Sequence, residues 1–193
     1  HLDLYYLHRR DRQVPIEESV GELGRLEQEG KIGGVGLSEV SAATFRQARQ
    51  EHPIAAVQSE YSVWTRNPEI ALLDACRESN TVLVAFSPLG RAFLTGTLRD
   101  PARLEEADMR RGMPRFSADN YPRNLALLAE FEALARQREC TPAQLALAWL
   151  RGQGADVIPI PGSRTATHQE ENLAAEALTL DAGTLALINA MMT

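Results

Sequence analysis

Two patterns of apolar residues alternate along this chain: short continuous runs, and segments in which apolar residues recur every three or four positions. The short runs, rich in aliphatic and aromatic residues, favour strands. The predicted strands are Leu2–Leu7, Ile32–Leu37, Ala55–Ser59, Thr81–Phe86 and Val157–Ile160. Thr81–Phe86 is an uninterrupted apolar run, which is typical of a strand buried on both faces.

Between these runs the apolar positions follow helical spacing. In Ile16–Glu29 they fall at Ile16, Val20, Leu23 and Leu26 with charges between them, and Gly30 ends the helix. The other predicted helices are Ser41–Gln50, Pro68–Ser79, Pro122–Arg138, Thr141–Gly152, Thr165–Ala177 and Asp181–Met192. Residues 88–120, rich in Gly, Pro and Arg, are predicted to form an excursion loop with room for one short helix, and loops of that length are often functional.

The alternation of strands and helices predicts a parallel sheet with helical crossovers. An open doubly wound sheet and a (β/α)₈ barrel both fit it. The glycine fingerprint of an open dinucleotide fold is missing, because Gly33-Gly34-Val35-Gly36 falls within a predicted strand. In a barrel, chemistry sits at the carboxyl ends of the strands. Those ends carry polar residues and one aromatic: His8, Ser38, Glu39, Gln58, Phe86, Ser87 and Gly162-Ser163-Arg164.

Composition narrows the function. The net charge of −6 argues against nucleic acid as a partner, and no apolar run approaches the ~20 residues of a membrane span. Cys76 and Cys140 lack paired spacing, which argues against disulfides and zinc and makes a reducing, cytoplasmic location the default. The four histidines show no ligand spacing, so no metal site is predicted.

A candidate anion site follows the last strand. Val157–Ile160 leads through Pro161-Gly162 into Ser163 and Arg164, with a predicted first helical turn over residues 163–167. Backbone N–H groups at a helix start, together with an arginine, suit a nucleotide phosphate. An ordinary strand-to-helix connection with a surface arginine explains the same pattern.

Several stretches together resemble the aldo-keto reductases, in their family order and spacing. They are Asp3–His8, Gly36–Glu39, Val57–Ser62, Ala85–Gly90 and Ile158–Asn172, so the resemblance covers essentially all of residues 1–193, as one domain. It is closest to the bacterial branch. The resemblance implies a (β/α)₈ TIM barrel, incomplete here with about five of eight β/α units. It also implies NADPH-dependent reduction of small aldehydes and ketones to alcohols by hydride transfer.

The resemblance assigns roles at four strand ends. His8 matches the active-site histidine that orients the substrate carbonyl, whereas a lone histidine at a strand end is otherwise more often structural. Ser38 and Gln58 match side chains that hydrogen-bond the nicotinamide carboxamide. Phe86 matches an aromatic stacked on the nicotinamide ring, with core packing as the alternative. Glu39 departs from the family's usual Asn, and a carboxylate cannot donate to the amide oxygen.

The remaining matches concern the rest of the cofactor. The loop of Ser87, Pro88, Leu89, Gly90 and Arg91 resembles one that runs along the pyrophosphate. Gly162, Ser163 and Arg164 match the adenosine 2′-phosphate site, and His168 stands where relatives often have an arginine for that phosphate. Glu171 and Asn172 match the pair that reads the adenine amino edge, or are plain helix surface.

The catalytic set implied by the resemblance is not complete in this chain. The family's tyrosine, lysine and aspartate are expected before His1, and Lys31, the single lysine, is expected at the opposite end of the barrel. We therefore expect a partial chain, inactive by itself. A non-catalytic nucleotide-binding or regulatory module is the alternative, while the position of Lys31 argues against a Schiff-base aldolase. The oligomeric state and the physiological substrate are open.

Overall fold

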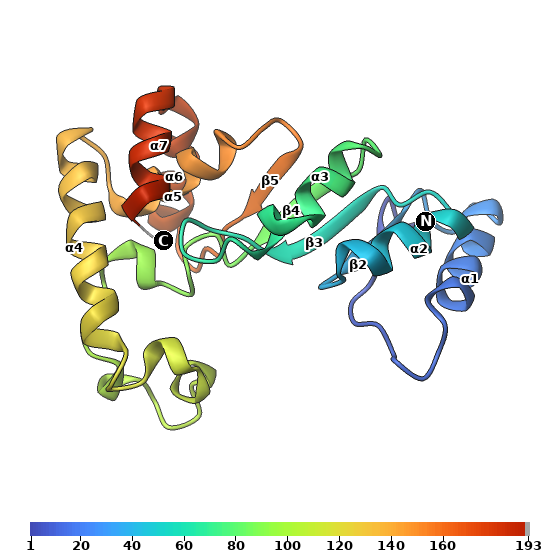
Figure 1. Cartoon of the computed structure of the whole chain (residues 1–193), viewed down its shortest axis with the longest axis horizontal. Helices are drawn as coiled ribbons and strands as arrows, with labels where there is room; N and C mark the ends of the chain where they lie inside the picture. The colour runs from blue at the N-terminus through green and yellow to red at the C-terminus, as the bar shows by residue number, and fades with distance from the viewer. Residues whose placement is uncertain (192–193) are drawn as a thin grey trace. The chain divides into compact units, whose positions relative to one another are not determined.

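A computed structural model describes residues 1–191 (Figure 1). The chain divides into two compact units. The sheet unit consists of His1–Tyr61, Arg66–Phe86 and Gly154–Ile160. The helical unit consists of Ser62–Thr65, Ser87–Gln153 and the segment from Pro161 onward.

The sheet unit holds a parallel sheet of five strands in the order β1-β2-β3-β4-β5. The strands are β1 (Tyr5–Leu7), β2 (Val35–Ser38), β3 (Ala56–Glu60), β4 (Val82–Phe86) and β5 (Val157–Ile160). All neighbours pair in parallel, and β5 (orange) lies beside β4 (green) in Figure 1. The α/β prediction is confirmed. A strand order that follows the chain is that of a barrel, since a doubly wound sheet reverses its order at a switch point.

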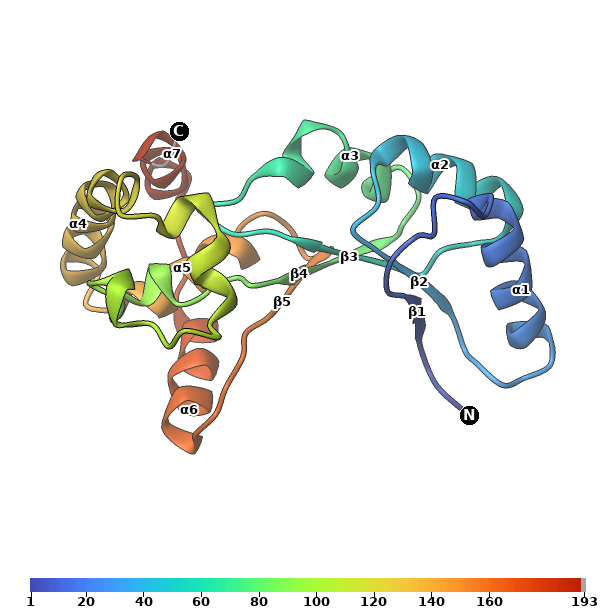
Figure 2. The ribbon, with the colours of Figure 1, turned by 90° about the horizontal axis from the view of Figure 1, so that it is seen from below.

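Helices cover one face of this sheet. They are α1 (Ile16–Gln28), α2 (Ala42–Glu51) and α3 (Leu72–Arg77), which follow one another along that face in Figure 2. Leu37, Val57 and Leu83 point into this layer and are fully buried. Because side chains alternate along a strand, the intervening residues share the opposite face.

The prediction that the strand Thr81–Phe86 is buried on both faces is wrong for the face opposite the helices. Only Leu83 and Ala85 are buried within β4, whereas Val82, Val84 and Phe86 are half-buried. The run is apolar throughout, but the layer of helices covers one face of it. Ile158 and Ile160 of β5 show the same effect, with exposed fractions of 48% and 44%.

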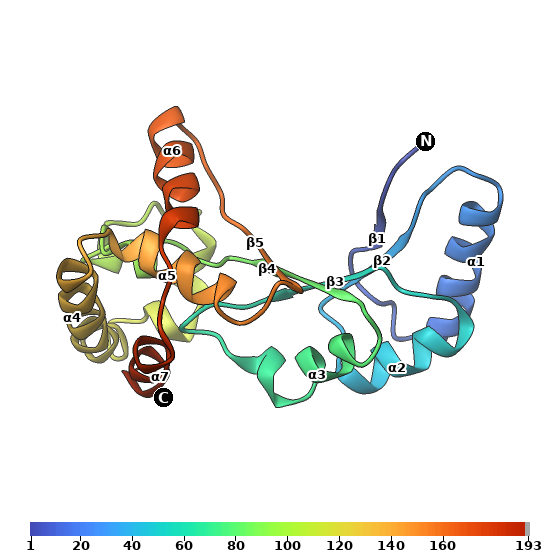
Figure 3. The same cartoon turned by 90° about the horizontal axis from the view of Figure 1, so that it is seen from above.

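The helical unit packs around aromatic and leucine side chains. Its helices are α4 (Tyr121–Gln137), α5 (Pro142–Arg151), α6 (Ala166–Ala174) and α7 (Ala182–Met191). Figure 3 shows α4 and α7 near α5. Trp149 of α5 is fully buried and donates its indole N–H to Asn189 of α7 at 2.9 Å. Thr141 caps the start of α5 as predicted, and the structure adds a capping box, in which Thr141 and Gln144 exchange hydrogen bonds.

Several element bounds differ from the predictions. The predicted helix Pro68–Ser79 is a 3₁₀ turn, Asn67–Ile70, followed by α3, with a break at Ala71 where φ is −164°. The excursion at residues 88–120 forms several 3₁₀ turns, three of which begin at a proline or after a capping aspartate, residue types that start short turns. These turns are Phe93–Thr95, Pro101–Arg103, Met109–Gly112 and Pro114–Phe116. The predicted helix Thr165–Ala177 is α6 followed by a 3₁₀ turn, Ala175–Ala177.

A candidate nucleotide site in the helical unit

A cavity of about 450 Å³ lies in the helical unit. Its walls come from three segments that are distant in sequence: the loop after β4, the start of α5, and the segment that leads into and along α6. Its lining residues are Ser87, Pro88, Leu89, Arg91, Ala92, Thr95, Thr97, Ala143, Gly162, Arg164, His168, Glu171 and Asn172. The size falls within the usual range for small-molecule sites.

The loop Ser87–Ala92 has an unusual backbone. Ser87 has a φ of 49°, and three successive residues, Gly90, Arg91 and Ala92, have φ values of 58°, 56° and 73°. Outside glycine, a left-handed residue costs roughly 1–3 kcal/mol, so the surroundings must hold this conformation. Backbone bonds contribute, from Gly90 N–H to the Ser87 carbonyl at 2.9 Å and from Phe93 N–H to the Gly90 carbonyl at 3.1 Å.

An aromatic cluster supports the same loop. The Trp64 ring stacks on Phe93 with centroids 3.9 Å apart, and Phe116 meets Trp64 edge-on at 5.8 Å. A Cβ on Gly90 would lie 3.2 Å from Trp64 Cε3, so both its positive φ and the tight packing favour glycine there. The loop therefore rests on a packed aromatic layer.

The α6 side of the cavity is exposed. Thr165 caps α6 by accepting from His168 N–H at 3.2 Å, so the first helical residue is Ala166, later than the predicted turn over residues 163–167. Arg164 thus precedes the cap. Asn172 donates its side-chain amide to Ser163 Oγ at 2.9 Å, which ties the incoming segment to the helix. No residue of α6 is buried.

The cavity suits a phosphorylated nucleotide. Arg91 and Arg164, which carry guanidinium groups, are among its lining residues, and the first N–H groups of α6 lack intrahelical acceptors. Leu89, Ala92 and Ala143 provide apolar surface for a base or ribose. Glu171, the acidic member of the lining, is an acceptor for an exocyclic amine rather than a partner for phosphate.

The predicted strand-end residues of the first four strands, His8, Ser38, Gln58 and Phe86, lie in the sheet unit, and the last three share one sheet face. Ser38 pairs with Gln58 in the β2–β3 register, and Phe86 of β4 pairs with Glu60 of β3 and Ile160 of β5. Two-residue alternation puts Ser38, Gln58 and Phe86 on the face opposite the helices. Ser38 is buried and accepts a bond from Arg9 Nη1 at 2.9 Å. His8 follows β1 directly and is exposed.

Glu39 has a role within the sheet. Its backbone is left-handed, with a φ of 55°, and its N–H donates to the Gln58 carbonyl at 2.9 Å. One carboxylate oxygen accepts from Ser59 Oγ at 3.1 Å and from Glu60 N–H at 2.9 Å. Glu39 therefore joins the ends of β2 and β3, beside Ser38 and Gln58.

Lys31 lies where the sequence places it, at the turn before β2 and thus at the amino end of that strand. Its ammonium pairs with Glu29 at 2.6 Å, and both side chains are largely exposed. The pKa of Glu29 is lowered, first by its hydrogen bond with Lys31 and then by the nearby charge. The lysine is thus engaged in a surface pair.

The described residues contain neither a metal cluster nor a bilayer-crossing helix. Over residues 1–191, no three His, Cys, Asp or Glu side chains gather as metal ligands would. None of the helices in that range combines the length and apolar character needed to span a bilayer.

The structure brings together one of the two groups of predicted residues within a single cavity. Ser87, Pro88, Leu89 and Arg91 line it together with Gly162, Arg164, His168, Glu171 and Asn172. Gly90 and Ser163 are not lining residues but contact residues near the cavity: Gly90 lies against Trp64, and Ser163 Oγ accepts a hydrogen bond from the lining residue Asn172. Sequence reasoning missed Ala92, Thr95, Thr97 and Ala143. Gly90 and Gly96 flank the first two and were a usable signal, whereas nothing in the sequence marks Ala143.

The chain-order parallel sheet with covering helices defines a (β/α)-barrel type of protein. Residues 1–192 match the model of the aldo/keto reductase family, and the chain belongs to that family. The resemblance seen in the sequence is therefore confirmed.

Individual relatives agree with this assignment. The chain is 45% identical over 177 residues to aldo-keto reductase yakc [NADP(+)] of Schizosaccharomyces pombe, covering 90% of this chain and 52% of that protein. It is 44% identical over 182 residues to aldo-keto reductase str7 of Strobilurus tenacellus, covering 93% and 54%. The chain thus spans about half the length of the curated relatives it matches.

Solved structures show the same fold. A glycerol dehydrogenase from Gluconobacter oxydans matches with a TM-score of 0.91 and 29% identity, over 98% of this chain and 58% of that one. The thermostable aldo-keto reductase Tm1743, solved with the inhibitor epalrestat, matches with a TM-score of 0.78 and 26% identity, over 99% and 60%.

Proposed function

We propose that this chain belongs to an NADP-dependent carbonyl reductase and that the cavity of the helical unit binds the adenosine 2′-phosphate end of the cofactor. The cavity carries the proposal, because Arg164 and the first turn of α6 meet there beside an apolar wall. One relative at 45% identity is named as NADP(+)-dependent. The bound cofactor would supply a hydride to a small aldehyde or ketone.

Arg164 is the residue proposed to select the phosphorylated cofactor. A guanidinium offers forked donors that match a phosphate, and it is charged at every relevant pH. His168 stands farther along α6 on the same wall, and an imidazole offers a phosphate fewer donors than the forked guanidinium of Arg164. Arg164 therefore carries the larger part of the proposed preference for NADPH over NADH.

The sheet unit supplies the other proposed roles. His8 orients the carbonyl, Ser38 and Gln58 hydrogen-bond the carboxamide, and Phe86 offers a ring face for stacking. That Ser38, Gln58 and Phe86 share one sheet face supports this assignment. Glu39 acts as a tether in this proposal, since its carboxylate already accepts two bonds from the end of β3. We further propose that residues 1–193 form part of one reductase domain.

Substitution of Arg164 tests the cofactor assignment. Charge-assisted bonds contribute about 1.5–3 kcal/mol, so Arg164→Ala should raise the NADPH dissociation constant roughly tenfold or more and leave NADH nearly unchanged. Arg123→Ala on α4, another exposed arginine of the same unit, serves as the control and should change neither. Equal weakening of both cofactors by Arg164→Ala would refute the proposed reading of the 2′-phosphate.

A further inference from the structure

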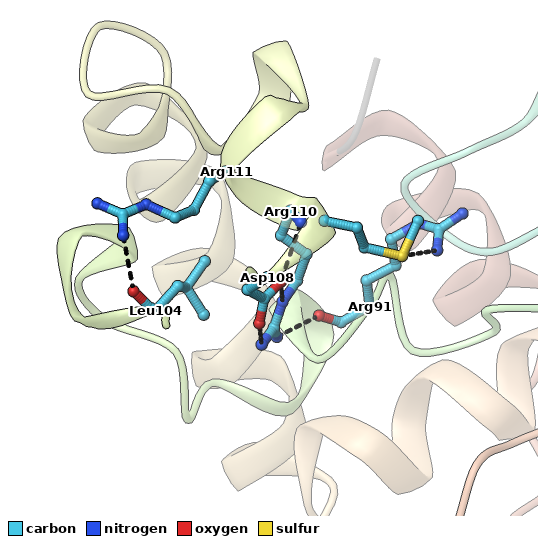
Figure 4. A network of polar contacts seen from close by, with 6 residues as sticks. Arg91, Leu104, Asp108, Arg110 and Arg111 are labelled. Atoms are coloured by element: carbon cyan, nitrogen blue, oxygen red, sulfur yellow. Dashed lines mark hydrogen bonds and ion pairs between the residues drawn. The ribbon is translucent and has the colours of Figure 1, made fainter. Parts of the chain in front are cut away.

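A salt-bridged arginine of the excursion loop contacts the left-handed segment of the cavity wall. Arg110 donates from Nη1 to the Arg91 carbonyl at 3.1 Å (Figure 4). The Arg91 carbonyl lies between two residues of positive φ, Arg91 itself and Ala92. Arg110 thus holds the backbone between two successive non-glycine residues in the left-handed region.

Arg110 is itself fixed by Asp108. Its Nε and Nη2 donate to the two carboxylate oxygens at 3.0 and 2.6 Å, a two-point contact that sets the plane of the guanidinium. Asp108 Oδ1 also accepts from Arg110 N–H at 2.9 Å, which starts the 3₁₀ turn Met109–Gly112. Both side chains are only about a fifth to a quarter exposed.

The electrostatics keep this pair ionised. Hydrogen bonds from the Arg110 side chain, then from its backbone, lower the pKa of Asp108 to about 2. The pKa of Arg110 is raised, first by its bond to Asp108. The contact therefore persists throughout the neutral range.

The neighbouring Arg111 offers a matched comparison. It donates from Nη1 to the Leu104 carbonyl at 3.2 Å, within the excursion loop itself, and does not line the cavity (Figure 4). Arg91, in contrast, lines the cavity and also donates to Met109 Sδ at 3.9 Å. The adjacent Arg110 and Arg111 thus carry equal charge but bind different carbonyls: Arg110 contacts a lining residue of the cavity, and Arg111 contacts only the excursion loop.

We infer that the Asp108–Arg110 pair positions the loop Ser87–Ala92 for cofactor binding. Resting on the proposed function, the inference makes Arg110 a positioning residue that acts through the Arg91 backbone. Because this loop is expected along the pyrophosphate, which NADPH and NADH share, loss of the pair should weaken both cofactors equally. That response differs from the one expected for Arg164.

The test compares dissociation constants of both cofactors in five proteins: the unsubstituted protein, Arg110→Ala, Arg110→Lys, Asp108→Asn and Arg111→Ala. Arg110→Ala should raise both constants about fivefold, with their ratio unchanged. Arg110→Lys keeps the charge but loses the two-point contact, so it should not restore binding. Asp108→Asn keeps the acceptor oxygen that starts the turn but loses the charge and the second acceptor for the Arg110 guanidinium. Both dissociation constants should therefore rise about as much as in Arg110→Ala. Arg111→Ala should stay within about twofold.

A second readout follows the loop directly. Trp64 packs beside Gly90, so Arg110→Ala should shift the tryptophan emission of the free protein, and Arg111→Ala should not. If Arg110→Ala and Arg111→Ala changed emission and affinity equally, or if Arg110→Lys bound both cofactors normally, the positioning role would be wrong. The proposed function would be unaffected by either result. An unsubstituted protein that binds neither cofactor would overturn the proposed function as well. Should Arg110→Ala fail to fold, Asp108→Asn decides the question.

Discussion

The two units present their candidate residues in different ways. In the helical unit, thirteen residues from three segments enclose one cavity. In the sheet unit, Ser38, Gln58 and Phe86 lie on one sheet face, and the side chains beside them are partly exposed. One unit holds a cavity with a partly exposed wall, whereas the other displays a surface. We therefore expect the proposed cofactor binding and the proposed chemistry to respond to changes in different parts of this chain.

The units also differ in how their backbones are constrained. The loop Ser87–Ala92 is strained and held by packing against Trp64 and by Arg110. The strand ends are held by regular ladder bonds, with the left-handed Glu39 as the local exception. A pre-formed loop can bind a ligand without further ordering cost, which favours affinity. We therefore expect changes in the two units to separate binding from reduction.

The largest expected effect concerns activity. Residues 1–193 alone should reduce a reactive aldehyde no faster than background with NADPH, yet bind adenosine 2′,5′-bisphosphate. His8 is proposed to orient the carbonyl, but Lys31 is paired with Glu29 at the opposite strand ends, so we expect no lysine-tuned tyrosine to protonate the oxygen. General acid catalysis contributes about 10²–10⁴-fold. NADPH oxidation followed by absorbance measures this, and clear turnover would show that another proton donor, such as Tyr6 or Tyr61, acts.

Substitution of one glycine in each unit tests whether stability and ligand binding depend on different units. A Cβ at Gly36 would lie 2.5 Å from Tyr6 Cδ1, so Gly36→Ala should destabilise the protein by about 1–3 kcal/mol and leave adenosine 2′,5′-bisphosphate binding within about twofold. Gly90→Ala should weaken that binding about fivefold or more, because Gly90 has positive φ and lies against Trp64.

Thermal unfolding and titration measure the two glycine effects separately. Gly112→Ala is the control, since a Cβ there would meet nothing within 4 Å. If Gly36→Ala weakened ligand binding as much as Gly90→Ala, the proposed separation of the units would be wrong.

The sequence predicts regular elements well where one local signal dominates. Thr141-Pro142 starts α5 as predicted, since a capping threonine and a first-turn proline act within a few residues. The break at Ala71 is not predictable, because alanine favours helix and only the surroundings impose its backbone angles. The same holds for the half-buried outer residues of β4, whose burial depends on what packs against the sheet.

The candidate site shows the same limit. Gly162-Ser163-Arg164 stands out because its residue types suit an anion. Arg91 and Ala92 carry no signal for their left-handed backbones, since neither type favours positive φ. Asp108 and Arg110 appear in sequence only as members of a charged loop. Their two-point contact and the bond to the Arg91 carbonyl depend on how the loop folds back on itself, which no local residue pattern specifies.

The smallest expected effects come from two threonine caps of the helical unit. Thr141 caps α5, seven of whose residues are buried, whereas Thr165 caps α6, which buries none. Removing a threonine cap typically costs about 1 kcal/mol. Thr141→Ala should therefore lower the melting temperature by a few degrees and change NADPH affinity little, because α5 belongs to the packed core.

Thr165→Ala should do the opposite. Loss of the bond to His168 N–H loosens the first turn of α6, which holds no core residue, so the melting temperature should barely change. NADPH affinity should fall about three- to fivefold, since the same turn is proposed to meet the 2′-phosphate. Calorimetry and fluorescence titration of both variants measure the pair. If Thr165→Ala lowered the stability as much as Thr141→Ala does, α6 would contribute to the core. The prediction that its first turn affects only NADPH binding would then be wrong.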